Sequence, residues 1–198
     1  MANGFVVTTV QNTQVLFDST PAPIIYTSAG QTSVMVPHEI AGRTSTQITV
    51  VYQGVKSAPL TYNVVTAVPG IYTQNQSGTG PGSILNQDYS VNGPTKPAAA
   101  GSVVQVYLTG TGDTQPPLVT GLVNTANKTS LLIYTATIAG MPAQVVYQGT
   151  APGDVEGVMQ FNIVVPAGAP SGPQPIVITS TSGNVTYATQ TGVTVQVQ

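Results

Sequence analysis

Charged side chains are scarce in this sequence. Only 5% of its 198 residues are Asp, Glu, Lys or Arg, against about 25% in an average soluble protein. The four basic residues are scattered along the chain, at Arg43, Lys56, Lys96 and Lys128. Such a surface has little electrostatic field to attract phosphate groups, so we expect neither nucleic acid nor an anionic membrane as a partner. The formal net charge of −2 gives little mutual repulsion, which favours association between molecules.

Cysteine and tryptophan are absent, and His38 is the only histidine. The lack of cysteine excludes disulfides, and a single histidine excludes a multi-histidine metal centre built from this chain alone. His38 and Glu39 form the one place where a base adjoins a carboxylate. Because they follow Pro37 at the end of an expected strand, we interpret them as an exposed loop rather than as catalytic groups.

The six carboxylates are also dispersed. Asp154 and Glu156 share one expected turn, but a Ca²⁺ site needs about six oxygen ligands or more, so a solvated turn is the preferred interpretation. A glycosidase needs two carboxylates that flank the substrate, and no local pattern supplies such a pair. We therefore expect no catalytic, cofactor-binding or metal-binding residues, and a protein that is not an enzyme.

Long apolar runs are missing too. None approaches the roughly 18 residues of a membrane-spanning helix. The first seven residues lack the basic segment followed by an apolar segment that marks an export signal. We expect no membrane span, and we expect that any export signal has been removed or never existed.

The sequence does contain many short apolar runs, and 41% of its residues are hydrophobic. The runs are four to seven residues long, rich in Val, Ile, Thr and Tyr, and end at Gly, Pro, Asn or Ser. This pattern is typical of β-strands separated by turns. No window keeps helical spacing of apolar residues over three turns. The sequence therefore predicts an all-β fold.

Two stretches, residues 21–52 and 141–180, share one plan. Three pairs of landmarks recur at nearly constant spacing: Tyr26 and Tyr147, Pro37 and Pro166, and Ile48 and Ile176, which are 121, 129 and 128 residues apart. This spacing indicates one fold used twice, with loop insertions in the second copy. We predict two tandem immunoglobulin-like β-sandwich domains, at residues 1–67 and 98–198. Residues 68–97, rich in Gly and Pro, are expected to form a connector with a short strand or hairpin.

The two copies differ at their beginnings. The second opens with an expected strand at residues 101–109, whereas the first has only residues 5–10 in a comparable role. A sandwich that lacks an edge strand exposes unpaired backbone groups and an apolar slot, which invites a strand from another chain. Two alternatives stay open: the strand from Phe5 to Val10 completes the first domain, or the chain is a fragment of a longer protein.

Several phrases resemble a bacterial family. They include Ala67-Val-Pro-Gly-Ile-Tyr72, Ile84-Leu-Asn-Gln-Asp-Tyr-Ser-Val-Asn92 and Ala151-Pro-Gly-Asp-Val-Glu-Gly-Val-Met-Gln-Phe-Asn162. In order and spacing they are similar to the uncharacterised C-terminal domain of Solibacter and other acidobacterial secreted proteins, itself similar to IPT/TIG immunoglobulin-like modules. The resemblance implies an exported or cell-surface protein next to other β-rich modules. It implies no catalytic residues.

These observations lead to two hypotheses of function. The first is a non-enzymatic extracellular structural or adhesive module that associates with itself or with neighbouring β-modules through strand edges, and that could form a fibre by donor-strand complementation. The second is a carbohydrate-binding module, in which Tyr72, Tyr89 and Tyr187 would contact a polysaccharide because tyrosine offers an apolar ring with a polar hydroxyl.

Overall fold

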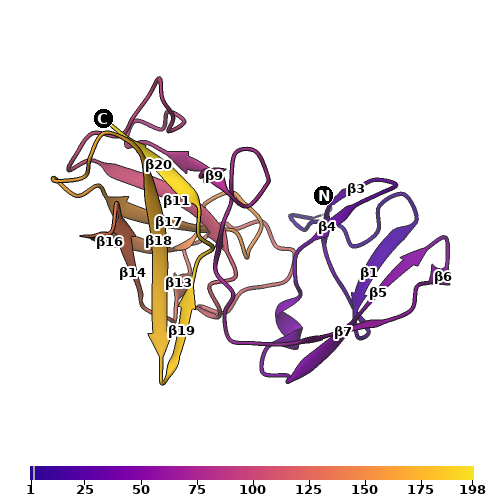
Figure 1. Cartoon of the computed structure of the whole chain (residues 1–198). Coiled ribbons are helices and arrows are strands. Elements are labelled where there is room, and N and C mark those ends of the chain that lie inside the picture. The colour runs from indigo at the N-terminus through magenta and orange to yellow at the C-terminus, as the bar shows by residue number, and fades with distance from the viewer. Residues whose placement is uncertain (2) are drawn as a thin grey trace. The chain divides into compact units, whose positions relative to one another are not determined.

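The computed structural model describes Met1 and residues 3–198 of the chain. In that part it contains twenty β-strands and one short 3-10 helix, η1 (His38–Ile40) (Figure 1). The predicted all-β class is therefore confirmed. The chain divides into two compact units, which are described one at a time below: the first comprises Met1–Thr66, Pro117–Ala126 and Pro152–Gly157, and the second comprises Ala67–Pro116, Asn127–Ala151 and Val158–Gln198.

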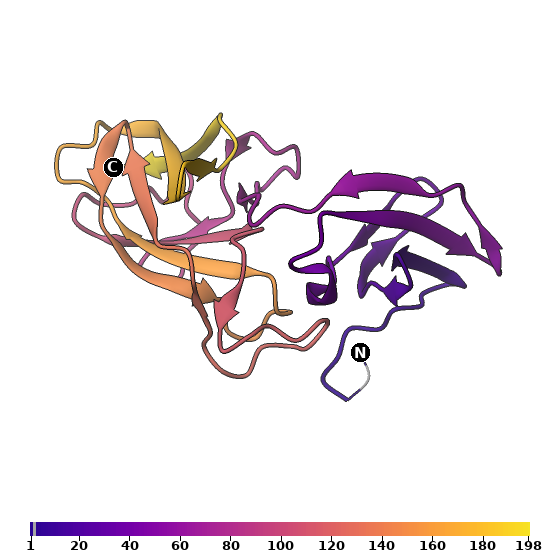
Figure 2. The same ribbon diagram turned by 90° about the horizontal axis from the view of Figure 1, so that it is seen from below.

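The first unit holds seven strands in two sheets. A five-stranded sheet has the order β2-β1-β5-β6, with β7 also paired to β5, and β3 and β4 form a two-stranded sheet. These strands are drawn in indigo to purple in Figure 2. The bounds are β1 Thr13–Phe17, β2 Thr20–Pro21, β3 Ile24–Thr27, β4 Thr32–Val34, β5 Ser45–Tyr52, β6 Val55–Lys56 and β7 Leu60–Asn63. Its hydrophobic core is small and consists of four buried side chains, Val15, Phe17, Ala22 and Ile40.

The second unit is larger. Its first sheet has the order β10-β11-β17-β16-β13-β12 with β8 also on β11, and its second has the order β15-β14-β18-β20-β9 with β19 also on β18. The bounds are β8 Gly70–Ile71, β9 Gly80–Pro81, β10 Ile84–Leu85, β11 Val103–Thr109, β12 Thr114–Gln115, β13 Thr129–Ser130, β14 Tyr134–Ile138, β15 Met141–Ala143, β16 Val145–Thr150, β17 Met159–Val164, β18 Gly172–Ser182, β19 Val185–Ala188 and β20 Val193–Val197.

Both sheets of the second unit contribute to one core. Apolar side chains alternate with partly exposed ones along β11, β17 and β20, as expected for strands with one buried face. Phe161 of β17 is fully buried and meets Tyr134 of β14 edge-to-face, with ring centroids 5.2 Å apart. Side chains from the two sheets thus interdigitate, and this packing defines a β-sandwich.

The strand arrangement repeats, as the landmark spacing predicted. Strands β1 to β7 and β14 to β20 follow the same path: a hairpin (β1–β2 and β14–β15), a second hairpin (β3–β4 and β16–β17), and a long strand that pairs with three others (β5 and β18). Even the irregularities recur, since β3 has a bulge between Ile24 and Tyr26 and β16 has one between Val145 and Tyr147. These bulges lie 121 residues apart, as the tyrosines do.

Residues 68–97 contribute to the second unit, whereas the sequence suggested a connector. Strands β8 and β10 pair with β11, and β9 pairs in parallel with β20. Ile71 and Ile84 are buried in the second core, which explains why this Gly- and Pro-rich stretch carries large apolar side chains. The buried Asn92 side chain bonds to both backbone groups of Gln196, at 2.8 and 2.7 Å. The stretch is therefore anchored to β20.

The predicted strand from Phe5 to Val10 does not form. This segment makes only isolated bridges, Phe5 with Leu122 and Val10 with Thr13. Residues 11 and 12 both have positive φ (48° and 59°), so the chain turns back after Val10. The Ile24 N–H donates to the Val7 carbonyl at 2.9 Å, which places the segment beside β3.

The turn between β14 and β15 offers a test of backbone strain. Ala139 there has a φ of 56°, and Gly140 follows at 73°. A left-handed conformation costs alanine about 1 kcal/mol, whereas asparagine adopts it readily and Asn-Gly suits such two-residue turns. We expect Ala139→Asn to raise the free energy of unfolding by about 1 kcal/mol, measured by urea denaturation.

The matched control is Ala41→Asn, because Ala41 is exposed and has a φ of −55°. This substitution should change stability by less than about 0.5 kcal/mol. An Ala139→Asn variant no more stable than the control would show that the turn is not strained.

Candidate functional site

The feature that sets the first unit apart is the outer edge of β4, here called the β4 edge (residues 32–36). Among the described residues, β4 has a hydrogen-bonded neighbour on one side only, β3. The equivalent strand of the second unit, β17, lies between β16 and β11. The first unit thus lacks the counterpart of β11, whose register on β17 runs over six residue pairs.

Backbone hydrogen bonds show which groups this edge presents. The Met35 N–H donates to the Pro23 carbonyl at 2.9 Å, and the equivalent Val164 N–H donates to the Gln144 carbonyl at 2.9 Å. The next N–H of the second unit, that of Val165, points the other way and donates to Ser102 beside β11. Since alternate residues of a strand point to opposite neighbours, the N–H groups of Val34 and Val36 point away from β3.

Side-chain burial reflects the missing strand. Val36 corresponds to Val165 through the matched prolines that follow each, and Val50 corresponds to Ile178. Val165 and Ile178 are 0% exposed, whereas Val36 is 53% and Val50 39% exposed. Val34 is only partly buried against the first core. The β4 edge therefore combines unpaired strand geometry with apolar side chains left open to solvent.

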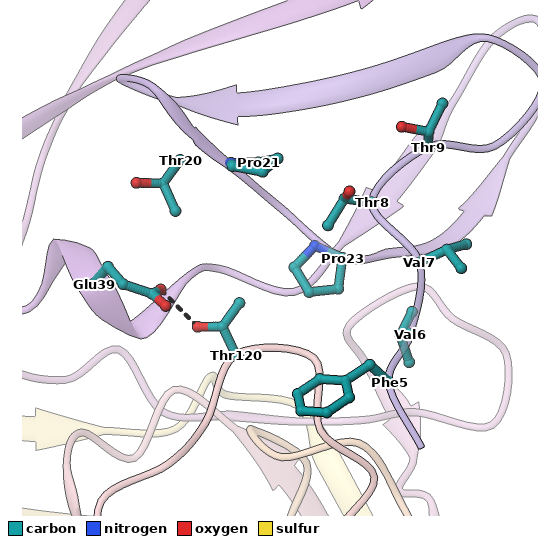
Figure 3. A pocket seen from close by; sticks show the side chains of 10 residues that line it. All are labelled: Phe5, Val6, Val7, Thr8, Thr9, Thr20, Pro21, Pro23, Glu39 and Thr120. Atoms are coloured by element: carbon teal, nitrogen blue, oxygen red, sulfur yellow. Dashed lines mark hydrogen bonds between the residues drawn. The ribbon is translucent and has the colours of Figure 1, made fainter. Parts of the chain in front are cut away.

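A shallow cavity of about 570 Å³ also lies in the first unit, beside the N-terminal segment (Figure 3). Its walls are mainly apolar, from Phe5, Val7 and Pro23, with several threonine hydroxyls. Glu39 is the one carboxylate among the lining residues, and it accepts a hydrogen bond from the Thr120 hydroxyl at 2.7 Å. With one carboxylate, the cavity does not offer an acid and base pair.

His38 lies beside this carboxylate but turns its backbone to the same threonine. Its N–H donates to Thr120 Oγ1 at 2.9 Å, and Thr120 donates onward to Glu39. His38 begins η1, where the sequence suggested an exposed loop, and it is partly buried. These two hydrogen bonds hold η1 against residues 117–126 of the first unit.

The predicted solvated turn at Asp154 and Glu156 is wrong for Glu156. That side chain is 1% exposed, and its Oε2 accepts the Val119 N–H at 2.5 Å. Sequence reasoning missed this because Val119 lies 37 residues away. Asp154 is exposed. Within the described residues, no group of three or more His, Cys, Asp or Glu side chains is placed to hold a metal ion.

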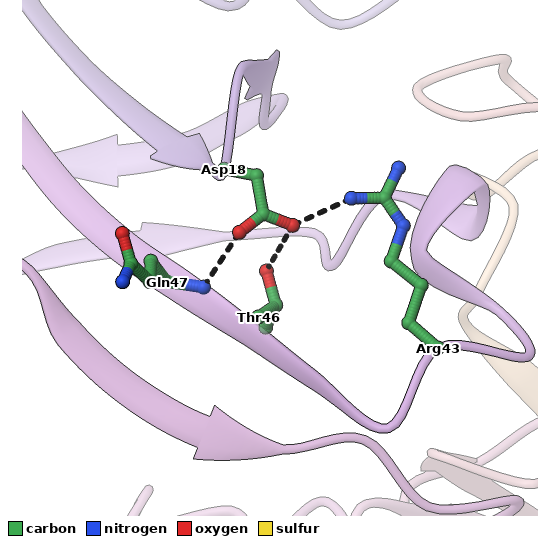
Figure 4. Close-up of polar contacts among 4 residues, drawn as sticks. All are labelled: Asp18, Arg43, Thr46 and Gln47. Atoms are coloured by element: carbon green, nitrogen blue, oxygen red, sulfur yellow. Dashed lines mark hydrogen bonds and ion pairs between the residues drawn. The ribbon is translucent and has the colours of Figure 1, made fainter.

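Asp18 forms a polar cluster in the first unit (Figure 4). Its two carboxylate oxygens accept the Gln47 N–H at 2.9 Å and the Thr46 hydroxyl at 3.1 Å, and Arg43 forms an ion pair with it. These bonds tie the β1–β2 turn to the start of β5. The Gln47 backbone bond is the main reason that the pKa of Asp18 lies below its usual value of 3.8. The cluster supports the fold.

The tyrosines predicted to contact a glycan all lie in the second unit. Tyr89 is 74% exposed and Tyr72 38% exposed, whereas Tyr187 of β19 is partly buried. They come from three separate segments, and the cavity of the first unit includes none of them.

No family model matches the chain, and no curated protein matches it. The resemblance to the acidobacterial domain therefore remains a prediction. Among the described residues, no helix has the length and apolar character required to cross a membrane.

The Asp18 cluster predicts a defined acid sensitivity. Because the folded-state pKa of Asp18 lies below 3.8, its ionised form contributes stability above the unfolded pKa, and this contribution is lost as pH falls through the folded value. We expect wild type to lose more stability than Asp18→Asn between pH 5 and pH 3, measured by urea denaturation at each pH.

Asp113→Asn is the control, since Asp113 is exposed and belongs to the second unit. Parallel loss of stability in wild type and Asp18→Asn would contradict the assignment.

Proposed function

We propose that this protein is a non-enzymatic structural or adhesive module that associates with itself through the β4 edge. The observation that carries the proposal is the contrast between equivalent strands: β17 is covered by β11, and β4 has no such neighbour among the described residues. An uncovered edge with apolar side chains is the usual template for pairing with another chain.

Composition supports association. The net charge of −2 on 198 residues gives little repulsion between copies. Residues 31–37 contain no charged side chain and no proline before Pro37, so the β4 edge lacks the lysines and prolines that commonly prevent edge pairing. The scarcity of charge near the edge also means that association should depend weakly on salt.

The disposition of ionisable groups supports a non-catalytic role. Asp18, Glu39 and Glu156 each bond to backbone N–H groups or threonine hydroxyls of the fold. Catalysis by general acids and bases requires such groups to converge on a substrate. An extracellular or cell-surface location is part of the proposal and rests on the resemblance to secreted acidobacterial modules.

The proposal predicts that the average mass of the particles in solution rises with protein concentration. We expect sedimentation velocity of the full chain to show a shift from monomer to larger species as concentration rises through the micromolar range, with little change between low and high salt. Electron microscopy of concentrated samples then separates closed oligomers from the fibres expected of donor-strand exchange. A strict monomer at all concentrations would contradict the proposal.

Carbohydrate binding is the second candidate, favoured by the exposed ring of Tyr89 and the partly exposed ring of Tyr72. In that case, insoluble polysaccharide should retain the wild-type chain, and Tyr72→Ala, Tyr89→Ala or Tyr187→Ala should reduce retention. If the lost aromatic contact contributes about 1.4 kcal/mol of binding free energy, its removal weakens binding about tenfold. Tyr62→Ala is the control, because Tyr62 is 55% exposed but lies in the first unit. Equal retention of all variants would exclude these tyrosines.

A further inference from the structure

We infer that the β4 edge is occupied by the β4 edge of a second copy of this chain, antiparallel about a two-fold axis at Val34. The inference rests on the proposed self-association and specifies its surface, register and symmetry. Three features of the chain support it: the strand that covers β17, the residue pattern of β4, and the direction of the backbone groups.

The second unit shows what this position requires. There β11 lies antiparallel to β17, with Val104 opposite Ile163 and Val106 opposite Phe161. Ser102 continues the pairing by accepting the Val165 N–H at 2.9 Å. Val104 and Val106 are 0% exposed. A covering strand therefore presents a small hydroxyl residue and two valines at alternate positions on the inner face.

Strand β4 carries the same pattern. Thr32, Val34 and Val36 alternate as Ser102, Val104 and Val106 do. Val34 packs against the first core, which shows that this set faces inward. A copy of β4 can thus supply the side chains that β11 supplies in the second unit.

Antiparallel pairing centred on Val34 puts those side chains in the corresponding places. Val34 of each copy lies opposite Val34 of the other, where Val104 lies opposite Ile163 in the second unit. Val36 of the covering copy lies opposite Thr32 of the other, in the place that Val106 has opposite Phe161. Thr32 of the covering copy lies opposite Val36, in the place that Ser102 has beside Val165. Because the contact is identical for both copies, it closes as a two-fold dimer and does not propagate.

The backbone groups fit this register. The N–H groups of Val34 and Val36 point away from β3, as the Val165 N–H points away from β16 towards Ser102. Two Val34 residues facing each other form a hydrogen-bonded antiparallel pair, in which each N–H meets the carbonyl of the other. Met35, which points to the face opposite Val34, has its methyl group over Gly157, where a Cβ would lie 2.5 Å from it.

Disulfide trapping tests the register, since the chain has no native cysteine. Facing residues of a hydrogen-bonded pair have Cα atoms about 5.5 Å apart, within the range that a disulfide spans. We expect Val34→Cys to give covalent dimers under mild oxidation, seen on non-reducing gels. In the same register the two Ser33 Cα atoms lie about 8 Å apart, so Ser33→Cys should crosslink at least tenfold more slowly.

Charge insertion tests the surface independently of crosslinking. Val36→Lys should weaken dimerisation at least tenfold in sedimentation velocity, because the ammonium group would be enclosed opposite Thr32 of the other copy. Val65→Lys is the matched control, since Val65 is 55% and Val36 53% exposed, and it should leave dimerisation unchanged. Both variants should fold, because both positions are exposed in the single chain.

The outcomes separate this inference from the proposed function. If wild type associates but Val34→Cys does not crosslink, if Ser33→Cys crosslinks as fast, or if Val36→Lys associates like Val65→Lys, the inference is overturned and self-association through another surface stands. If wild type is monomeric at every concentration, both fail.

Discussion

The pairing of backbone groups along strand edges governs this structure. Each peptide group in a sheet needs a partner on either side, and an edge that lacks one is left to solvent or to another chain. In the second unit, β11 supplies that partner for β17. In the first unit, β4 has β3 alone among the described residues. The same path of seven strands is thus covered along this edge in one case and open in the other.

The two units also differ in the size of their apolar cores. Six members of the second core precede the repeated block: Ile71, Ile84, Ala98, Val104, Val106 and Leu108. The first unit has no counterpart of these, and its core has four members. Apolar burial stabilises a fold by about 25 cal/mol per Å², so the first unit gains less from its own strands. Polar bonds such as those of Asp18 and Glu156 hold its turns and loops instead.

The positions of the ionisable residues are consistent with the proposed role in association. Each carboxylate described in the first unit either bonds within the fold or, like Asp154, faces solvent. The cavity beside the N-terminal segment is lined mainly by apolar side chains and threonines. The β4 edge, by contrast, carries apolar side chains and has β3 as its one neighbour among the described residues, and such an edge can bind another strand.

The sequence by itself determined the all-β class and the repeated plan marked by Tyr26 and Tyr147, whereas the bulges beside these tyrosines are seen only in the structure. Alternation, turn residues and spacing are local properties that can be read along the chain. The assignment of residues 68–97 to the second unit, the failure of Phe5 to Val10 to extend, and the burial of Glu156 were decided only by tertiary structure. Pairing partners lie far apart in sequence, and a strand's pattern states which face is buried but not which strand lies beside it. For that reason the sequence left open which strand completes the first unit, and the fold shows that β4 has β3 as its one neighbour among the described residues.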